Sequence, residues 1–413
     1  MAEVVLSDLK DKLQTCIHCG LCLEHCPTYR VTEEEMSSPR GRIHLMKGVV
    51  EGSIDISNAV LHEHEFSCLV CCSCETACPS GVEFSVLMEH TRNEIVRHRK
   101  KNLLSSFIYT KLLGSRGLTT TAQWLLSLGS KTGILRVMKR LATKEKGFLF
   151  SARLLPDTIN IPKHRPELYP TSTKKIGTVG LLIGCIGDVF TQQVNDATIK
   201  VLNKLGYDVR ILPAATCCGA LAAHAGYLDH ARSLARTTYA SIQTSGVDFF
   251  ISNIAGCGAM LKDYPSLLDG PIDISKIKDI SEFLYQYHRD DIAAWHLKFE
   301  SPKQISYQAP CHLYHGQKIV DTPMRLLGLI ENAEVNPLPE NELCCGSAGT
   351  YNLEQPEMAE ALLQRKIALI QQKNPQLVAT ANAGCLMQLA SGLERQRSHQ
   401  QVYHFIEIIA SLL

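Results

Sequence analysis

The sequence predicts an α+β multidomain protein, in which a mainly helical N-terminal domain is followed by two tandem α/β repeats. Three observations predict this fold. Cysteines gather in two groups of four near the N-terminus. A segment without cysteine follows, helical at first and then rich in proline. The C-terminal half contains two similar units, in which apolar, strand-like runs alternate with amphipathic helices. We expect boundaries at residues 1–98, 99–173, 174–298 and 299–413.

The composition argues against nucleic acid as a partner. The chain has 413 residues, of which 45% are hydrophobic, enough for several domain cores. Its 42 Lys and Arg nearly balance its 41 Asp and Glu, and only 6% of the residues are aromatic. Neither a net positive field nor a supply of stacking rings is therefore present, and we expect no nucleic-acid partner.

The seventeen cysteines are the unusual feature of the composition. The N-terminal residues are charged and do not resemble a signal peptide, which predicts a reducing compartment. There, grouped cysteines indicate metal or redox chemistry rather than disulfides. No apolar run reaches the ~18 residues of a membrane span, so we expect no transmembrane segment.

Two C-x2-C-x2-C-x3-C-P motifs define the N-terminal domain. Their cysteines are Cys16, Cys19, Cys22 and Cys26 in the first motif, and Cys68, Cys71, Cys74 and Cys78 in the second. Three closely spaced thiolates suit one [4Fe–4S] cluster, and the fourth ligates the other cluster in two-cluster ferredoxins. We therefore expect a helical ferredoxin-like domain with two [4Fe–4S] clusters, one held by Cys16, Cys19, Cys22 and Cys78 and the other by Cys68, Cys71, Cys74 and Cys26.

Structural zinc is the alternative for these eight thiols. Zinc sites usually pair two C-x2-C units across a longer loop. Here each motif places four cysteines within eleven residues, which favours iron–sulfur clusters. Cys72 lies out of register and is interpreted as a bystander. Neither motif leaves an open ligand position, so the expected role is electron transfer rather than substrate chemistry.

The segment at 99–173 is expected to be helical and then a linker. Apolar stretches such as Leu103-Leu104, Phe107-Ile108 and Trp124-Leu125-Leu126 alternate with Lys and Arg. The linker contains Pro156, Pro162, Pro166 and Pro170. Such an amphipathic stripe contacts a membrane surface, a partner, or its own domain, and the last is the preferred interpretation.

The C-terminal half is an internal duplication. Cys185, Cys217 and Cys257 recur as Cys311, Cys344 and Cys385, at offsets of 126, 127 and 128 residues. In each copy we expect a strand (178–186; 304–309), a helix (197–205; 324–329) and a second strand (249–253; 376–380). The cysteines fall where strands end, which is where ligands bind in parallel α/β sheets.

Each copy supplies four cysteines to a candidate metal site. These are Cys185, Cys217, Cys218 and Cys257 in the first copy, and Cys311, Cys344, Cys345 and Cys385 in the second. Gly219 and Gly346 follow the cysteine pairs, as expected where backbone approaches a ligand closely. Four thiolates suit either a further cluster or zinc, and buried free cysteine is the remaining alternative.

The repeated pattern resembles the cysteine-rich CCG domain of heterodisulfide reductases and several dehydrogenase subunits. In that family a copy that closes with C-x-x-C holds a non-cubane [4Fe–4S] cluster. Here Met260 and Gln388 stand at the closing positions. Nearby, His224, His312 and His315 are candidate relays or ligands, although an ordinary hydrogen-bonded histidine is the preferred interpretation. No nucleotide, flavin or nucleophile-elbow motif occurs.

Taken together, the motifs resemble the family of iron–sulfur subunits of glycolate oxidase (glycolate dehydrogenase). The resemblance is carried by CIHCGLCLEHCPTY at 16–29, SPRGRIHLMK at 38–47, CLVCCSCETACPSGVEF at 68–84, LCCGSAGTY at 343–351 and TANAGC at 380–385. Arg40 and Arg42 in the second of these stretches are candidate donors to a cluster sulfide or a partner carboxylate, or part of a surface turn.

The resemblance implies that a separate FAD-binding subunit oxidises glycolate to glyoxylate and that this chain passes the electrons to a quinone-type acceptor. It also implies a cytoplasmic complex, or one held peripherally on the inner face of the membrane. No catalytic residue is expected in this chain. Alternatives keep the role but change the substrate to D-lactate or glycerol 3-phosphate, make the chain a heterodisulfide reductase-like enzyme, or make it a redox-sensing scaffold.

Overall fold

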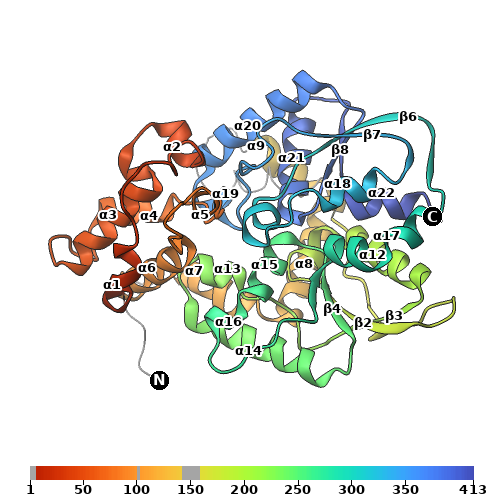
Figure 1. Cartoon of the computed structure of the whole chain (residues 1–413), viewed down its shortest axis with the longest axis horizontal. Helices are drawn as coiled ribbons and strands as arrows, with labels where there is room; N and C mark the ends of the chain where they lie inside the picture. Colours follow the sequence, from red (N-terminus) through yellow and green to blue (C-terminus); the bar gives the residue numbers. More distant parts are fainter. Residues whose placement is uncertain (1–5, 100–102, 142–158) are drawn as a thin grey trace.

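The computed structural model describes residues 6–99, 103–141 and 159–413. The N-terminal domain lies at one end of the molecule and the two repeats form the larger remainder (Figure 1). Helices and parallel-rich sheets are both present, which confirms the α+β prediction. No helix among the described residues is long and apolar enough to cross a membrane.

The N-terminal domain is helical, as expected. Its elements are η1 (Leu6–Leu9), α1 (Lys10–Gln14), α2 (Pro27–Thr32), η2 (Glu35–Ser37), α3 (Pro39–Val50), α4 (Ala59–Phe66), α5 (Ser73–Thr76) and α6 (Phe84–His98). The first cysteine motif ends at a helix start, because Pro27 occupies the first position of α2, whereas Pro79 after the second motif lies in a turn before α6. Between the motifs, the Ser38 side chain caps α3 just before Pro39. A small apolar core of Leu13, Met46 and Leu87 supports the two cysteine loops.

The connecting segment contains α7 (Leu103–Phe107), a π-helical turn η3 (Ile108–Leu112), α8 (Arg116–Lys131) and α9 (Ile134–Leu141). The prediction that this segment packs against its own protein is correct for one face of its helices and wrong for the other. Tyr109 and Leu135 are buried, whereas Leu103, Trp124 and Leu125 are 80%, 56% and 62% exposed. Of the predicted linker, Pro156 lies outside the described residues.

The first repeat is a five-stranded sheet with β2 at its centre. The strands are β1 (Leu168–Tyr169), β2 (Gly177–Leu182), β3 (Tyr207–Ile211), β4 (Phe249–Ser252) and β5 (Ile277–Asp279), in the order β1-β3-β2-β4-β5. All pairs are parallel except β1 with β3. The helices are α11 (Gly187–Phe190), α12 (Gln192–Leu205), α13 (Ala220–His224), α14 (Leu228–Thr244), α15 (Ala255–Lys262), α16 (Tyr264–Leu267) and α17 (Ile280–Ala293).

The second repeat reproduces this order without the first edge strand. Its all-parallel sheet is β7-β6-β8-β9, from β6 (Lys298–Tyr307), β7 (Glu331–Pro337), β8 (Leu377–Thr380) and β9 (Gln401–His404). The helical elements are η5 (His312–Gly316), α18 (Thr322–Leu327), α19 (Tyr351–Glu354), α20 (Pro356–Lys373), α21 (Ala383–Arg395) and α22 (Phe405–Ser411). The shared strand order is what two copies of one ancestral unit produce.

The two repeats share one core. The first helix of each repeat packs against the last helix of the other, α12 with α22 and α18 with α17. Val179 and Phe283 from the first repeat join Tyr307 and Phe405 from the second in a single buried cluster. Burial on this scale fixes the repeats relative to each other, and with them the positions of their cysteines.

Candidate metal centres

The second cysteine motif and the last cysteine of the first motif line a common cavity. The lining side chains are His25, Cys26, Pro27, Thr28, Pro39, Arg42, Cys68, Leu69, Val70, Cys71, Cys72, Cys74 and Phe84. Burial raises the pKa of the thiols of Cys68, Cys71 and Cys74. The charge of Cys26 raises each of them further, which places Cys26 near all three. The structure therefore brings together the four thiols expected to hold one cluster.

The thiols of the other expected set lie closer to the surface. Cys16, Cys22 and Cys78 are partly buried and border the core of the domain, whereas Cys19 is exposed. Burial raises the pKa of the Cys22 thiol to about 11, and the charges of Cys26 and Cys16 add to this. Pairing of Cys78 with Cys16, Cys19 and Cys22 stays a prediction.

Both cysteine loops turn through left-handed residues at matching positions. His18 and Gly20 have φ values of 56° and 86°, and Val70 and Cys72 have values of 50° and 61°. Cys72 therefore occupies the backbone position that Gly20 fills in the first motif. Its thiol donates to the Val70 carbonyl at 3.7 Å, and its role as a bystander stays a prediction.

Two buried arginines surround the second motif. Arg42 donates to the His64 carbonyl at 2.7 Å and to the Ser67 hydroxyl at 2.9 Å, and Arg92 donates to the Cys68 carbonyl at 2.6 Å. Their positive charges oppose the rise that burial imposes on the pKa of Cys68. They are suited to stabilise negative charge in the cavity.

The surface-turn alternative for Arg40 and Arg42 is wrong, whereas donation to a cluster or a partner stays a prediction. Both residues lie in the first turn of α3 rather than in a surface turn. Arg40 pairs with Glu35 at 2.6 Å, whereas the side chain of Arg42 is fully buried. The sequence did not predict a role for Arg92, because a single arginine on an amphipathic helix is usually exposed to solvent.

In the first repeat, four cysteines lie just beyond the C-terminal ends of three neighbouring strands. Cys185 follows β2, Cys217 and Cys218 follow β3, and Cys257 lies in the first turn of α15, which follows β4. The sulfurs of Cys185 and Cys217 are 3.7 Å apart. Hydrogen bonds from Cys185 and Cys218 hold the pKa of Cys217 well below its usual range, and Cys218 also contacts Cys257.

The second repeat builds the same arrangement from β6, β7 and α21. The Cys311 and Cys344 sulfurs are 3.9 Å apart. Hydrogen bonds from Cys344 and Cys385 hold the pKa of Cys345 well below its usual range. Neighbouring thiols shift in the opposite direction, since hydrogen bonds and burial raise the pKa of Cys185 and Cys344 well above their usual range.

The four thiols of each repeat form a chain of contacts rather than a shell around one point. In the part of the chain that the structure describes, no three His, Cys, Asp or Glu side chains converge as a single ion requires. Met260 is buried in the core of its repeat, and the Gln388 amide oxygen accepts from Asn352 at 3.0 Å. Neither closing position supplies a thiol. Metal binding at these donor sets stays a prediction, and iron, zinc and buried free cysteine all remain open.

The glycines after the cysteine pairs are required by the neighbouring helix. Gly219 and Gly346 have φ values of 93° and 88°. A Cβ atom at these positions would lie 3.0 Å from the Ala231 carbonyl oxygen and 2.6 Å from that of Ala359. The backbone here therefore lies close to the helix α14 or α20, and its predicted approach to a ligand stays a prediction.

The three histidines have different surroundings. His315 contacts the Thr76 hydroxyl at 2.9 Å and the Glu342 carbonyl at 2.8 Å, as expected for an ordinary hydrogen-bonded histidine. His224 contacts Glu89 at 2.9 Å. His312 lies 3.6 Å from the Cys311 sulfur, and its Nε2 has no hydrogen-bond partner among the described residues.

A buried lysine distinguishes the two repeats. Lys366 lies on α20 and is 1% exposed, and burial lowers its pKa to about 8 although the charges of Cys345 and Cys344 oppose this. Thr238 on α14 occupies the corresponding place and donates to the Cys217 carbonyl at 3.0 Å. The second site therefore has a neighbouring lysine where the first has a threonine. This difference is visible in the sequence when the two repeats are aligned.

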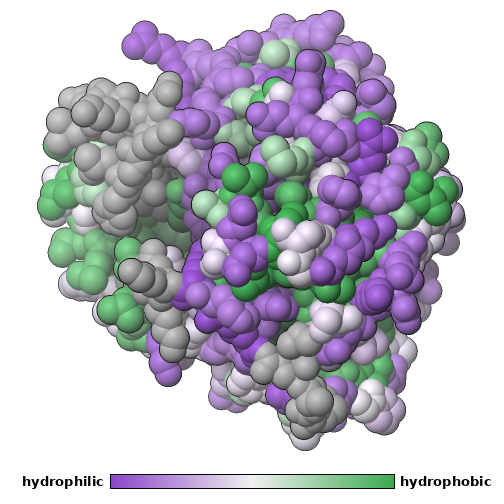
Figure 2. Space-filling view, turned by 90° about the vertical axis from the view of Figure 1, so that its left-hand side faces the viewer, coloured by the Kyte–Doolittle hydropathy of each residue, from purple (hydrophilic) through white to green (hydrophobic). Residues whose placement is uncertain are grey.

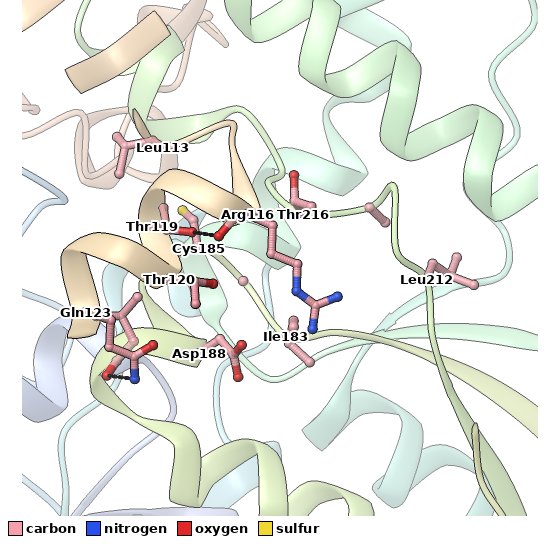
Figure 3. Close-up of a pocket in the computed structure, with 13 residues that line it drawn as sticks. Leu113, Arg116, Thr119, Thr120, Gln123, Ile183, Cys185, Asp188, Leu212 and Thr216 are labelled. Atoms are coloured by element: carbon pink, nitrogen blue, oxygen red, sulfur yellow. Dashed lines mark hydrogen bonds between the residues drawn. The ribbon is translucent and has the colours of Figure 1, made fainter. Parts of the chain in front are cut away.

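The surroundings of the two sites also differ. Cys71 of the second motif belongs to one buried cluster with Cys311 and Cys344. Cys185 of the first repeat instead lines a pocket together with Thr119 and Gln123 of α8, beside Asp188 (Figure 3). The N-terminal domain therefore covers one site, and α8 covers the other.

Comparisons with known proteins match this architecture. The family described as "4Fe-4S dicluster domain" matches residues 12–82, and that described as "Cysteine-rich domain" matches residues 179–262 and 305–390. The chain is 34% identical to the probable glycolate oxidase iron-sulfur subunit of Bacillus subtilis (strain 168), over 93% of this chain and 90% of the relative. It is 31% identical to the glycolate oxidase iron-sulfur subunit of Escherichia coli (strain K12), over 97% and 94%.

A further relative is shorter. Lactate utilization protein A of Bacillus licheniformis is 28% identical over 56% of this chain and 99% of its own length. The two glycolate oxidase relatives extend over 93% and 97% of this chain. The chain therefore belongs to the family of glycolate oxidase iron–sulfur subunits.

Proposed function

We propose that this chain is the electron-transfer subunit of a glycolate dehydrogenase complex, with two [4Fe–4S] clusters and no substrate site of its own. The cavity that joins Cys26 to Cys68, Cys71 and Cys74 is the observation that carries the proposal. It unites thiols from both motifs, as a two-cluster ferredoxin domain requires. The clusters supply one-electron carriers, which a two-electron flavin reaction needs.

The family supplies the rest of the proposal. A partner subunit with FAD oxidises glycolate to glyoxylate, and a quinone-type acceptor receives the electrons. The complex is cytoplasmic or peripheral on the inner face of the membrane. The similarity to lactate utilization protein A favours lactate as the second candidate substrate, because the partner selects the substrate. Met260 and Gln388 argue against a heterodisulfide reductase-like enzyme, since neither supplies a thiol.

The burial of the cysteines suggests where the partner docks. Cys19 is the exposed member of the eight thiols, and Ile17 and Leu21 beside it are 67% and 58% exposed. Figure 2 shows the molecule from the end at which the N-terminal domain lies, where hydrophobic residues are interspersed with hydrophilic ones. Cys71, by contrast, is buried against the second repeat. The loop around Cys19 is therefore the proposed docking face for the FAD subunit.

The proposal is tested by Cys19→Ala, with Cys72→Ala as the matched control, each co-produced with the partner subunits under anaerobic conditions. Cys19→Ala should remove about four irons per chain, the content of one [4Fe–4S] cluster, and block glycolate-dependent dye reduction while the partner keeps its FAD. Cys72→Ala should retain iron and activity. Full activity of an assembled Cys19→Ala complex would overturn the proposal.

A further inference from the structure

The surface of α8 and α9 carries a row of exposed apolar side chains. Leu118, Trp124, Leu125 and Leu128 recur at helical spacing on α8, and Ile134 and Val137 continue on α9; each is between 41% and 62% exposed. We call these six residues the α8–α9 surface. A contiguous apolar row of this kind marks an interaction site, because isolated exposed apolar residues do not align along one helix face.

The same segment is strongly basic. No Asp or Glu occurs between Glu94 and Glu145, whereas eleven Lys and Arg do, five of them within α8 and α9. Lys131 and Arg136 are exposed at the junction of α8 and α9. The chain as a whole has a net charge of only +1, so this concentration of positive charge is local. An anionic surface is the complement of such a segment.

The opposite face of α8 is fixed to the protein. The Gln123 amide donates to the Asn160 carbonyl at 3.1 Å and to the Val189 carbonyl at 3.3 Å. Leu135 of α9 packs with Ile159, and Phe190 lies against both. The helix is therefore held with its apolar face outward, and its inner face lines the Cys185 pocket (Figure 3).

We propose that the α8–α9 surface binds the interface of an anionic lipid bilayer. Exposed Trp, Leu and Ile enter the boundary between headgroups and acyl chains, and Lys131 and Arg136 meet the lipid phosphates. A protein partner fits less well, because protein interfaces are depleted of Lys and this segment has no acidic residue to orient a mixed-charge partner. This inference deepens the proposed peripheral location and places the Cys185 site beside the membrane.

The test is flotation of the intact complex with quinone-free vesicles of 30% phosphatidylglycerol in phosphatidylcholine. The wild-type complex should bind, and Leu125→Glu with Leu128→Glu should lower the partition coefficient by about tenfold or more. Lys131→Glu with Arg136→Glu should lower it by a similar factor at low salt only. Val320→Glu adds one carboxylate at a residue that is 45% exposed elsewhere and should bind like the wild type.

A direct readout comes from Trp124, one of two tryptophans in the chain. Its fluorescence should shift to the blue with these vesicles, and the shift should disappear in Trp124→Phe. Glycolate-dependent dye reduction without vesicles should be unchanged in all variants, which separates this inference from the proposed function. Absence of wild-type binding, equal binding by the double glutamate variant, or loss of subunit assembly in that variant would overturn the bilayer as the occupant.

Discussion

The thiols of Cys71 and Cys311 lie in one buried apolar cluster, although they belong to the N-terminal domain and the second repeat. Burial raises the pKa of the Cys71 thiol well above its usual range, and the charge of Cys311 adds to the effect. The two sites are therefore electrostatic neighbours. The first repeat has no such neighbour among the contacts that the structure describes for Cys185.

This proximity predicts different effects for Cys311→Ser and Cys185→Ser. Each variant removes one thiol and should lower the metal content of one repeat. Because only Cys311 adjoins Cys71, only Cys311→Ser should also alter the EPR spectrum of an N-terminal cluster in the reduced protein. Identical spectra from the two variants would contradict the arrangement.

The crossed ligand sets predict which cysteine pairs act together. Cys26→Ser and Cys68→Ser should each remove the same cluster, so the double variant should retain about four irons in the N-terminal domain. Cys26→Ser combined with Cys16→Ser should lose both clusters. Iron analysis of the two anaerobically purified double variants distinguishes the sets, and the reverse pattern would show that each motif holds its own cluster.

Arg42→Met should destabilise the protein by about 3 kcal/mol or more, because hydrogen bonds from a charged donor to buried carbonyl and hydroxyl groups are lost. The guanidinium is completely buried and donates to His64, Thr28 and Ser67. Arg40→Met removes only a partly exposed ion pair with Glu35 and should cost less than about 1 kcal/mol. Urea midpoints followed by circular dichroism check both variants, and equal midpoints would contradict the prediction.

Gly346→Ala should destabilise the second repeat by about 2 kcal/mol or more. The backbone there has a φ of 88°, and a Cβ atom would lie 2.6 Å from the Ala359 carbonyl oxygen. Gly129→Ala is the matched control, since nothing lies within 4 Å of its added Cβ in α8 and alanine favours a helix by about 0.5–1 kcal/mol. Thermal unfolding should move in opposite directions for the two variants.

Burial of the His404 imidazole leads us to expect that the protein loses stability in acid. The side chain is fully buried, and desolvation lowers its pKa from 6.5 to about 4. Below pH 6.5 the unfolded chain binds a proton that the folded chain does not, so the free energy of unfolding falls as the pH drops from 6.5 towards 4. The loss should reach about 2 kcal/mol at pH 5.

Urea midpoints of the intact protein at pH 7 and pH 5 measure this loss. His404→Asn keeps a side-chain acceptor for the Ile406 amide and should show a smaller difference between the two midpoints. The exposed His399 provides the control, and His399→Asn should keep the wild-type difference. An unchanged pH dependence in His404→Asn would contradict the assignment.

Several features of the site were beyond sequence reasoning for a physical reason. The burial of Arg42 and Arg92 was not predicted, because burial of an arginine depends on partners that are distant in sequence, here the carbonyls of His64 and Cys68. The apolar stretches of α7 and α8 were interpreted as faces that pack against the protein, but several of their side chains are exposed. Hydrophobic periodicity shows that a helix has an apolar face but not whether another element covers it.

The sequence by itself determined the two cluster motifs, the duplicated α/β unit with its strand-end cysteines, and the family. These features are encoded in local spacing and in a repeated pattern, both of which survive without knowledge of distant contacts. Only the tertiary structure decided that Arg42 and Arg92 are buried around the second motif, that Cys71 lies against Cys311, and that the α8–α9 surface is exposed. Each depends on which helices the two repeats and the N-terminal domain present to one another, and the burial of a shared core sets that choice.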